Sequence, residues 1–125
     1  MPKPTLEFFT PMTDDASWSP IPGIDGLHEL ILARDEDSGD YTRLLRFAPG
    51  TDTSPQGLQR HEFWEEVWIV SGAIHDLGYD RTFSAGMYAC RPPDMPHGPW
   101  VSPEGCVTFE IRYHDRSVPT GSSSR

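Results

Sequence analysis

Cysteine, basic side chains and long apolar segments are all scarce in this sequence of 125 residues. Ten basic residues stand against nineteen acidic ones, which gives a formal net charge of -9. Such a chain lacks the positive surface that attracts phosphate groups, so we expect no nucleic-acid partner. No apolar stretch approaches the roughly 20 residues that a membrane-spanning helix needs, so we expect no membrane partner either.

Two further scarcities bear on the cellular compartment. The segment MPKPTLEFFTPMTDD, residues 1–15, has no apolar core of the length that a signal peptide needs, so we expect a cytoplasmic protein. Two cysteines in such a chain, Cys90 and Cys106, are expected to be reduced packing residues rather than a disulfide. The length predicts one domain with a core that needs no crosslinks.

The sequence also lacks apolar patterns of helical period, whereas 13 prolines and 11 glycines divide it into short segments. These features predict an all-β fold, either a small antiparallel barrel or a sandwich. A turn at Ser71–Gly72 is expected to separate the third and fourth strands. The candidate strands are residues 27–34, 41–48, 63–70, 73–78, 82–85, 87–92 and 106–114.

The organisation expected from these segments is a single barrel with two extensions. Residues 1–26 are rich in proline and hold Trp18, and we expect them to form an arm that packs on the barrel. The barrel itself is expected at residues 27–116. Residues 117–125 contain GSSSR and are expected to form a flexible tail.

The stretch QRHEFWEEVWIVSG, residues 59–72, alternates like a strand with one buried face. Glu66, Trp64 and Trp68 fall on the opposite face, where the tryptophans would be covered by the N-terminal arm or by a dimer interface. A buried imidazole or carboxylate needs a partner, so the presence of His61 and Glu65 on the inward face requires an explanation. That face holds Gln59, His61, Phe63, Glu65, Val67 and Ile69.

A second informative stretch is GMYACRPPDMPHGPW, residues 86–100, which leads from a strand to His97. Together, the two stretches make the sequence resemble the cupin superfamily over roughly residues 44–113. Gly72 fixes the register of the first cupin motif, which places Glu65 on its glutamate, His61 on its second histidine and Gln59 on its first. The residues that match the second motif are Gly86, Pro92 and His97.

This resemblance implies a small antiparallel cupin barrel, also called a double-stranded β-helix or jelly roll. Residues 89–106, ACRPPDMPHGPWVSPEGC, are most similar to the group that contains zinc anti-sigma-factor cupins and diketone-cleaving dioxygenases. The sequence departs from the pattern at Gln59, Asp94 and Val101. A longer segment before Gln59 leaves Gln56 as a rival for its position.

The implied metal ligands are His61, Glu65 and His97, with Gln59 as a weak ligand or as a holder of metal-bound water. Two imidazoles and one carboxylate suit one divalent ion, with Fe(II) favoured and Mn(II), Ni(II) or Zn(II) as alternatives. Since protonated histidines release metal, we expect affinity to fall between about pH 7 and 6.

Arg91 is the candidate catalytic residue, because a guanidinium in an apolar cavity can bind a carboxylate or enolate oxygen. Its alternative role is to pair with Glu65, Glu110 or Asp94. Candidates for apolar lining or core are Phe63, Val67, Phe83, Phe109 and Ile111. His28, His75 and His114 match no motif position and are expected to be structural or surface residues.

The resemblance favours a metal-dependent enzyme acting on a small carbonyl, phenolic or carboxylate compound, most simply a diketone-cleaving non-haem dioxygenase. A non-redox metal enzyme (isomerase, cyclase or hydrolase) and a non-catalytic sensor of metal or small ligands remain alternatives. The expected partners are a small-molecule substrate and a second copy of the chain, since outward tryptophans and sheet edges need cover.

Overall fold

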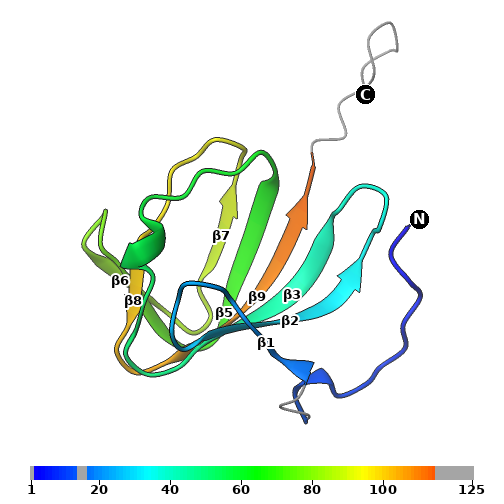
Figure 1. Ribbon diagram of the computed structural model, residues 1–125, viewed down its shortest axis with the longest axis horizontal. Helices are drawn as coiled ribbons and strands as arrows, with labels where there is room; N and C mark the ends of the chain where they lie inside the picture. Colours follow the sequence, from blue (N-terminus) through cyan, green and yellow to red (C-terminus); the bar gives the residue numbers. More distant parts are fainter. Residues whose placement is uncertain (1, 14–16, 115–125) are drawn as a thin grey trace, which may run out of the picture.

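The computed structural model describes residues 2–13 and 17–114, and it is nearly all β (Figure 1). The expected tail at residues 117–125 lies outside these ranges. Short 3₁₀ helices occur at η1 (Pro11–Thr13) and η3 (Ser54–Gln56). The strands are β1 (Ser19–Pro20), β2 (Leu27–Arg34), β3 (Tyr41–Phe47), β4 (Thr51–Asp52), β5 (Trp64–Asp76), β6 (Arg81–Ser84), β7 (Tyr88–Arg91), β8 (Trp100–Ser102) and β9 (Cys106–Tyr113).

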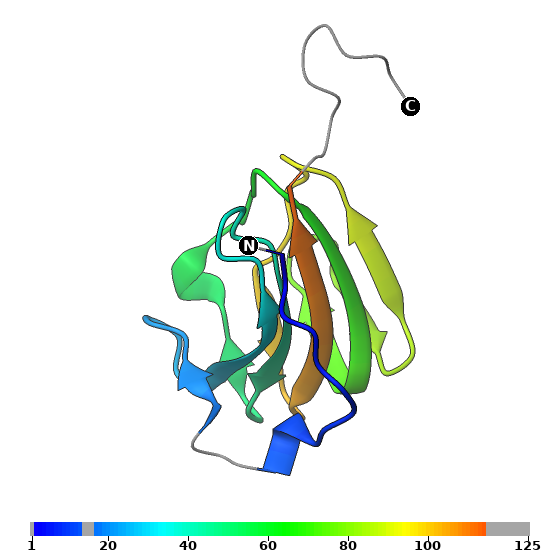
Figure 2. The same cartoon turned by 90° about the vertical axis from the view of Figure 1, so that its right-hand side faces the viewer.

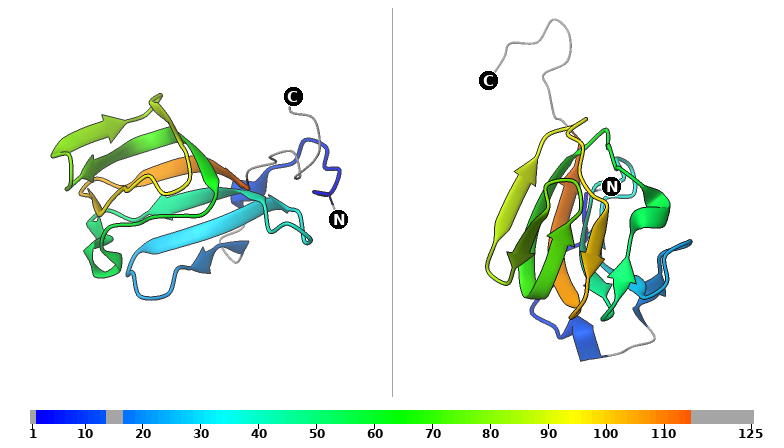
Figure 3. Two further views of the ribbon diagram at one scale, coloured as in Figure 1. Left: turned by 90° about the horizontal axis from the view of Figure 1, so that it is seen from above. Right: turned by 90° about the vertical axis from the view of Figure 1, so that its left-hand side faces the viewer.

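All described strand pairs are antiparallel, in the order β1-β2-β3-β9-β5-β8-β4, with β6 and β7 also paired to β5. Seen from above, the strands follow a curl rather than a flat sheet (Figure 3). The predicted small antiparallel β-barrel is therefore confirmed. Of the described helices, none is long and apolar enough to cross a membrane.

Strand β5 connects the two halves of the curl. Its first part pairs with β9 and β7, and its second part pairs with β6 and β8. The predicted turn at Ser71–Gly72 is wrong, because the strand continues through it with a register shift between Ile69 and Ser71. Gly72 has φ 75°, and a Cβ atom there would lie 2.0 Å from the Gly105 carbonyl oxygen, so only glycine fits this bend.

Apolar clusters lie on both faces of the sheet. Inside the curl, a cluster at one end is formed by Ile24, Leu27, Leu45, Phe47, Ile69, Ile74, Trp100 and Cys106. On the outer face, Trp18 packs with Leu30 and Leu44, and the N-terminal segment runs along this side of the sheet (Figure 2). Phe109 packs against this outer cluster, so of its two expected places, cavity lining or core, it takes the core one.

Beyond Cys106, the inward face of β9 is polar rather than apolar. Thr108 and Glu110 are buried there, while Phe109 and Ile111 alternate with them on the outer side. Val107 and Phe109 pack outward against the cluster that contains Trp18. Polar side chains are thereby left for the interior of the curl.

Candidate metal centre

The three expected metal ligands come from different segments that meet at one end of the curl. Glu65 is the second residue of β5 and points inward. The alternation over residues 59–72 had suggested that His61 also lies on this strand, but His61 lies in the loop before β5. His97 lies in the loop between β7 and β8. The two loops are joined by backbone hydrogen bonds, from Gln59 N to His97 O at 2.8 Å and from His97 N to Gln59 O at 3.0 Å.

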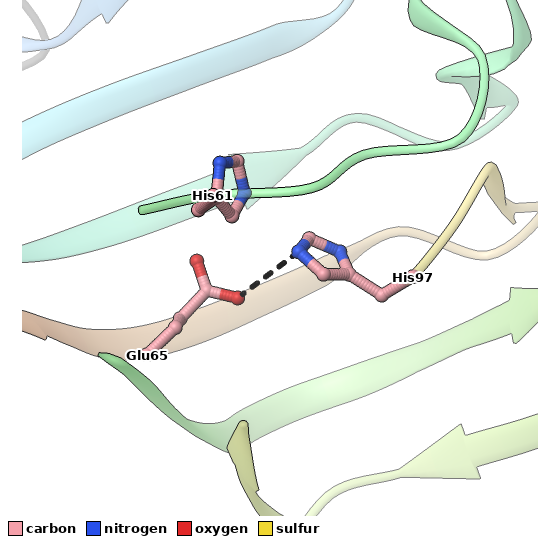
Figure 4. Close-up of side chains that lie close together, drawn as sticks. All are labelled: His61, Glu65 and His97. Carbon is pink, nitrogen blue, oxygen red and sulfur yellow. Dashed lines mark ion pairs between the residues drawn. The ribbon is translucent and has the colours of Figure 1, made fainter. Parts of the chain in front are cut away.

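This bridge brings both imidazole rings next to the Glu65 carboxylate (Figure 4). One potential ligand atom from each of His61, Glu65 and His97 lies within 4.8 Å of the others. Nε2 of His97 is 3.9 Å from Oε1 of Glu65, and the centroids of the His61 and His97 rings are 4.8 Å apart. His61 also stacks on Phe63 with centroids 4.6 Å apart, which fixes the orientation of its ring.

Buried ring nitrogens test whether these residues suit a metal ion. Within the described part of the chain, Nε2 of His61 and both ring nitrogens of His97 are buried without a hydrogen-bond partner. Each unsatisfied buried polar atom costs about 1–3 kcal/mol, and a cation coordinated there would remove this cost for one ring nitrogen of each histidine. Two imidazoles and a carboxylate are also suitable ligands for Fe(II), Mn(II), Ni(II) and Zn(II). The residues therefore fit a divalent ion.

Burial keeps both rings uncharged. It lowers the pKa of His61 to about 4 and that of His97 to about 3, and the guanidinium groups of Arg112 and Arg91 act in the same direction. Neutral imidazoles are ready to bind a cation well below pH 6. Metal loss is accordingly predicted below the expected range of about pH 7 to 6, which used the pKa of an exposed imidazole.

Glu65 is held by two arginines. Its Oε2 accepts a hydrogen bond from Arg112 Nε at 2.7 Å and forms an ion pair with Arg112 Nη2 at 2.6 Å, and its Oε1 accepts a hydrogen bond from Arg91 Nη1 at 3.1 Å. Burial and the Glu110 carboxylate raise the pKa of Glu65, whereas both guanidinium groups favour its ionised form. The direct bonds to both oxygens support a carboxylate that stays charged at neutral pH.

Arg91, the expected catalytic residue, thus pairs with Glu65, which was one of its two anticipated roles. Its guanidinium carbon also lies 5.0 Å from the centroid of the Trp100 ring, a cation–π contact. Arg91 and Glu65 are direct partners across β7 and β5, so the pairing follows from strand register. Whether Arg91 also contacts a ligand remains a proposal.

Arginine and glutamate pairs continue across the inner face beyond Glu65. Arg43 donates through Nε to Glu110 and through Nη1 to Glu29, both at 2.8 Å. Arg112 Nη2 lies 3.8 Å from the Glu110 carboxylate and so joins this pair to Glu65. Sequence reasoning missed Arg43 and Arg112, although the alternation in CVTFEIRYH places Thr108, Glu110 and Arg112 on one face.

Gln59 and Gln56, the two candidates for a weak fourth metal ligand, contact one another. The Gln59 side-chain amide donates from Nε2 to the Gln56 carbonyl oxygen at 2.9 Å. Both residues border the same cavity as the two histidines. The part of Gln59 in metal binding stays a prediction.

The cavity beneath the histidines has a volume of about 220 Å³. Liquid water occupies about 30 Å³ per molecule, so this space matches roughly seven waters or a ligand of similar volume. Its walls combine apolar side chains such as Leu45, Phe47 and Ile74 with the charged groups described above. The site can therefore take a small molecule and gives it both polar and apolar contacts.

The remaining cysteines and histidines lie outside the cluster. Cys106 is buried and Cys90 is exposed, both as free thiols, so the expectation of a packing role fits Cys106 alone. The His75 ring contacts Thr82 and Asp80. The His114 ring contacts Asp40 at 2.8 Å.

Comparison with known proteins gives the following matches. The sequence model of the ChrR cupin-like domain family matches residues 7–114. No curated protein matches the chain. An RmlC-like cupin from Shewanella frigidimarina is 21% identical with a TM-score of 0.69, covering 93% of this chain and 96% of that one.

Two further solved structures share the fold. An acetylacetone dioxygenase from Acinetobacter johnsonii is 16% identical with a TM-score of 0.68, covering 97% of this chain and 86% of that one. The structure of Rhodobacter sphaeroides SigE in complex with the anti-sigma ChrR gives 21% identity and a TM-score of 0.59, covering 78% of this chain and 48% of that one. At these identities the likeness concerns the fold.

Proposed function

Because this chain belongs to the ChrR cupin-like family, we propose that it is a metal-dependent enzyme that acts on a small carbonyl, phenolic or carboxylate compound. The reaction that we propose is oxidative cleavage of a β-diketone type of substrate by a non-haem Fe(II) dioxygenase. The observation that carries the proposal is the cluster of His61, Glu65 and His97 with its unpartnered ring nitrogens. The fold shared with an acetylacetone dioxygenase supports the reaction type.

The residues of the chain would divide the work as follows. His61, His97 and Glu65 would hold the metal, and Gln59 would supply a weak ligand or hold a water beside it. When bound, a divalent ion supplies Lewis acidity and, if it is iron, redox capacity. Arg91 would orient the polar end of the substrate, and the apolar walls would exclude bulk water. The cavity volume of about 220 Å³ favours small substrates.

The direct test is oxygen consumption by protein reconstituted with single metals. Fe(II)-loaded protein should take up O2 with at least one member of a panel of β-diketones and hydroxyaryl ketones, and the His97→Ala protein should not. Turnover of a panel member by Zn(II)- or Ni(II)-loaded protein without O2 uptake would instead support a non-redox isomerase, cyclase or hydrolase. Failure of every divalent ion to bind near one equivalent would overturn the metal assignment.

A second candidate is a non-catalytic sensor domain for metal or small ligands. The likeness to an anti-sigma factor bound to its sigma factor favours it. The discriminating result would be stoichiometric metal binding together with ligand-dependent stabilisation and no turnover of any panel compound.

A further inference from the structure

The inner face of the curl carries alternating charges that run continuously across the sheet. Beginning on β2 and ending on β7, the order is Glu29, Arg43, Glu110, Arg112, Glu65 and Arg91. Three of the contacts join residues that face each other across neighbouring strands: Arg43 with Glu110, Glu65 with Arg112, and Glu65 with Arg91. The network is therefore built into strand register.

The negative charges of three carboxylates and the positive charges of three guanidinium groups balance in this network. A divalent cation on neutral His61, neutral His97 and Glu65 would add two positive charges beside the buried side chains of Glu65 and His97. Unpaired charge in such surroundings is costly, so the metal-loaded site should attract negative charge from a ligand. The balance of charges thus points to an anionic compound.

The two oxygens of Glu65 differ in how they are held. Oε2 has two short contacts with Arg112, a hydrogen bond from Nε at 2.7 Å and an ion pair with Nη2 at 2.6 Å. Oε1 receives a single longer bond from Arg91, at 3.1 Å, and is the oxygen 3.9 Å from His97 Nε2. A cation held by the histidines would therefore compete with Arg91 for Oε1.

We propose that Arg91 exchanges partners when metal binds, leaving Glu65 Oε1 and binding the negative group of the ligand. Trp100, 5.0 Å from the guanidinium, would keep the arginine over the cavity during this exchange. The ligand class is a small carboxylate or enolate anion, and metal and anion bind with positive coupling. This inference rests on the proposed function, since it requires a metal at His61, Glu65 and His97.

The experiment is a calorimetric titration of malonate into the full chain, both metal-free and loaded with Ni(II). Malonate is a small dicarboxylate, and malonamide, its neutral analogue, controls for shape. The loaded protein should bind malonate at least tenfold more tightly than the metal-free protein, and malonamide should show no such gain. Equal affinity of the loaded and metal-free forms for malonate would overturn the proposal.

Variants separate this role from simple structural support. Arg91→Gln should still bind Ni(II), as tightly as the wild type or more tightly, and should lose about tenfold to hundredfold in malonate affinity when loaded, the loss expected for a charge-assisted hydrogen bond. Arg91→Lys should recover part of that affinity. The matched control is Arg81→Gln, which removes the same charge on β6 beside Phe83 and should leave malonate binding unchanged.

The possible failures can be told apart. If Arg91→Gln loses Ni(II) together with malonate while its circular dichroism spectrum stays native, Arg91 supports Glu65 and the exchange is wrong. If the wild type binds Ni(II) at one equivalent but Arg91→Gln binds malonate normally, the inference falls and the proposed function stands. If the wild type binds no metal, the proposed function fails as well.

Discussion

At the scale of single residues, the buried imidazoles of His61 and His97 govern metal binding. Replacing either by alanine removes one of the three strong donors in the cluster, so we expect bound metal to fall from about one equivalent to a small fraction. Gln59→Ala should lower metal content less, since an amide oxygen is a weak donor. Metal analysis of protein purified without chelators measures all three variants.

The control for these alanine variants is His75→Ala. The His75 ring contacts Thr82 and Asp80, outside the cluster, so its removal should leave metal content unchanged. Circular dichroism should show native strand content throughout, because apolar clusters and backbone pairing hold the fold. A full equivalent of metal in both His61→Ala and Glu65→Ala would contradict the assignment.

The same histidines predict how stability depends on pH in metal-free protein. Unfolding exposes imidazoles that protonate near pH 6.5, whereas the folded protein holds the pKa of His61 at about 4 and that of His97 at about 3. Between these values the unfolded state binds more protons, so stability is lost as pH falls from 6.5. The slope is at most about 1.4 kcal/mol per pH unit for each histidine.

Urea unfolding of chelator-treated protein at a series of pH values from about 7.5 to 4.5 measures this slope. The His97→Phe protein should lose part of the slope, because phenylalanine has no proton to gain. A His97→Phe protein with the same pH dependence as the wild type would show that other groups govern acid stability.

At the scale of elements, β5 depends on its bend at Gly72. Gly72→Ala would force a Cβ atom against the Gly105 carbonyl oxygen and place alanine at φ 75°. Strain of both kinds should lower the free energy of unfolding by at least about 2 kcal/mol. Gly39→Ala is the matched control, since Gly39 has φ 80° with open space around it, and it should lose only about 1 kcal/mol.

Both losses are measured by chemical denaturation. Equal stabilities of the two variants would show that the close approach to Gly105 is relieved by small movements. The comparison therefore separates backbone conformation from crowding at the position that fixes the motif register.

The longer strands were predictable because alternation needs several residues to be visible. Residues 64–70 and 106–111 show it, whereas β1, β4 and β8 are two or three residues long and carry no periodic signal. The convergence of His61 with His97 came from motif resemblance, since no local pattern reveals a bridge between two loops. The arginine network was missed because the alternation of side chains along β9 does not tell which of its two faces points inward. The apolar face points outward, toward the cluster that contains Trp18.

At the scale of the whole molecule, an apolar area on the outer face of β5 and β7 lacks cover within the described chain. Trp68 is 51% exposed, Tyr88 61% and Val70 43%. The described N-terminal segment packs near Leu30 and Leu32 on β2 instead, so it does not fill the covering role that was one alternative for Trp68. Contact with a second copy is the alternative that stays as our prediction.

Sedimentation should therefore find a dimer at micromolar concentration, and Trp68→Asp should shift it toward monomer. Leu77→Asp is the matched control, because Leu77 is 43% exposed at a turn beyond the end of β5. A monomeric wild type at high micromolar concentration would contradict dimerisation. So would a Leu77→Asp protein that dissociates as readily as Trp68→Asp.

The alternating charges on the inner face constrain how this pocket can evolve. Glu110 lies between Arg43 and Arg112, and Glu65 lies between Arg112 and Arg91. Changing one of these residues therefore leaves the charges of its neighbours without a partner. Leaving one buried charge unpaired costs about 3–5 kcal/mol, whereas replacing both partners together is often neutral. Drift in this pocket should therefore proceed by paired substitutions. Aligned homologues should show Arg43 and Glu110 changing together, while Arg112 stays as long as Glu65 is kept as a metal ligand.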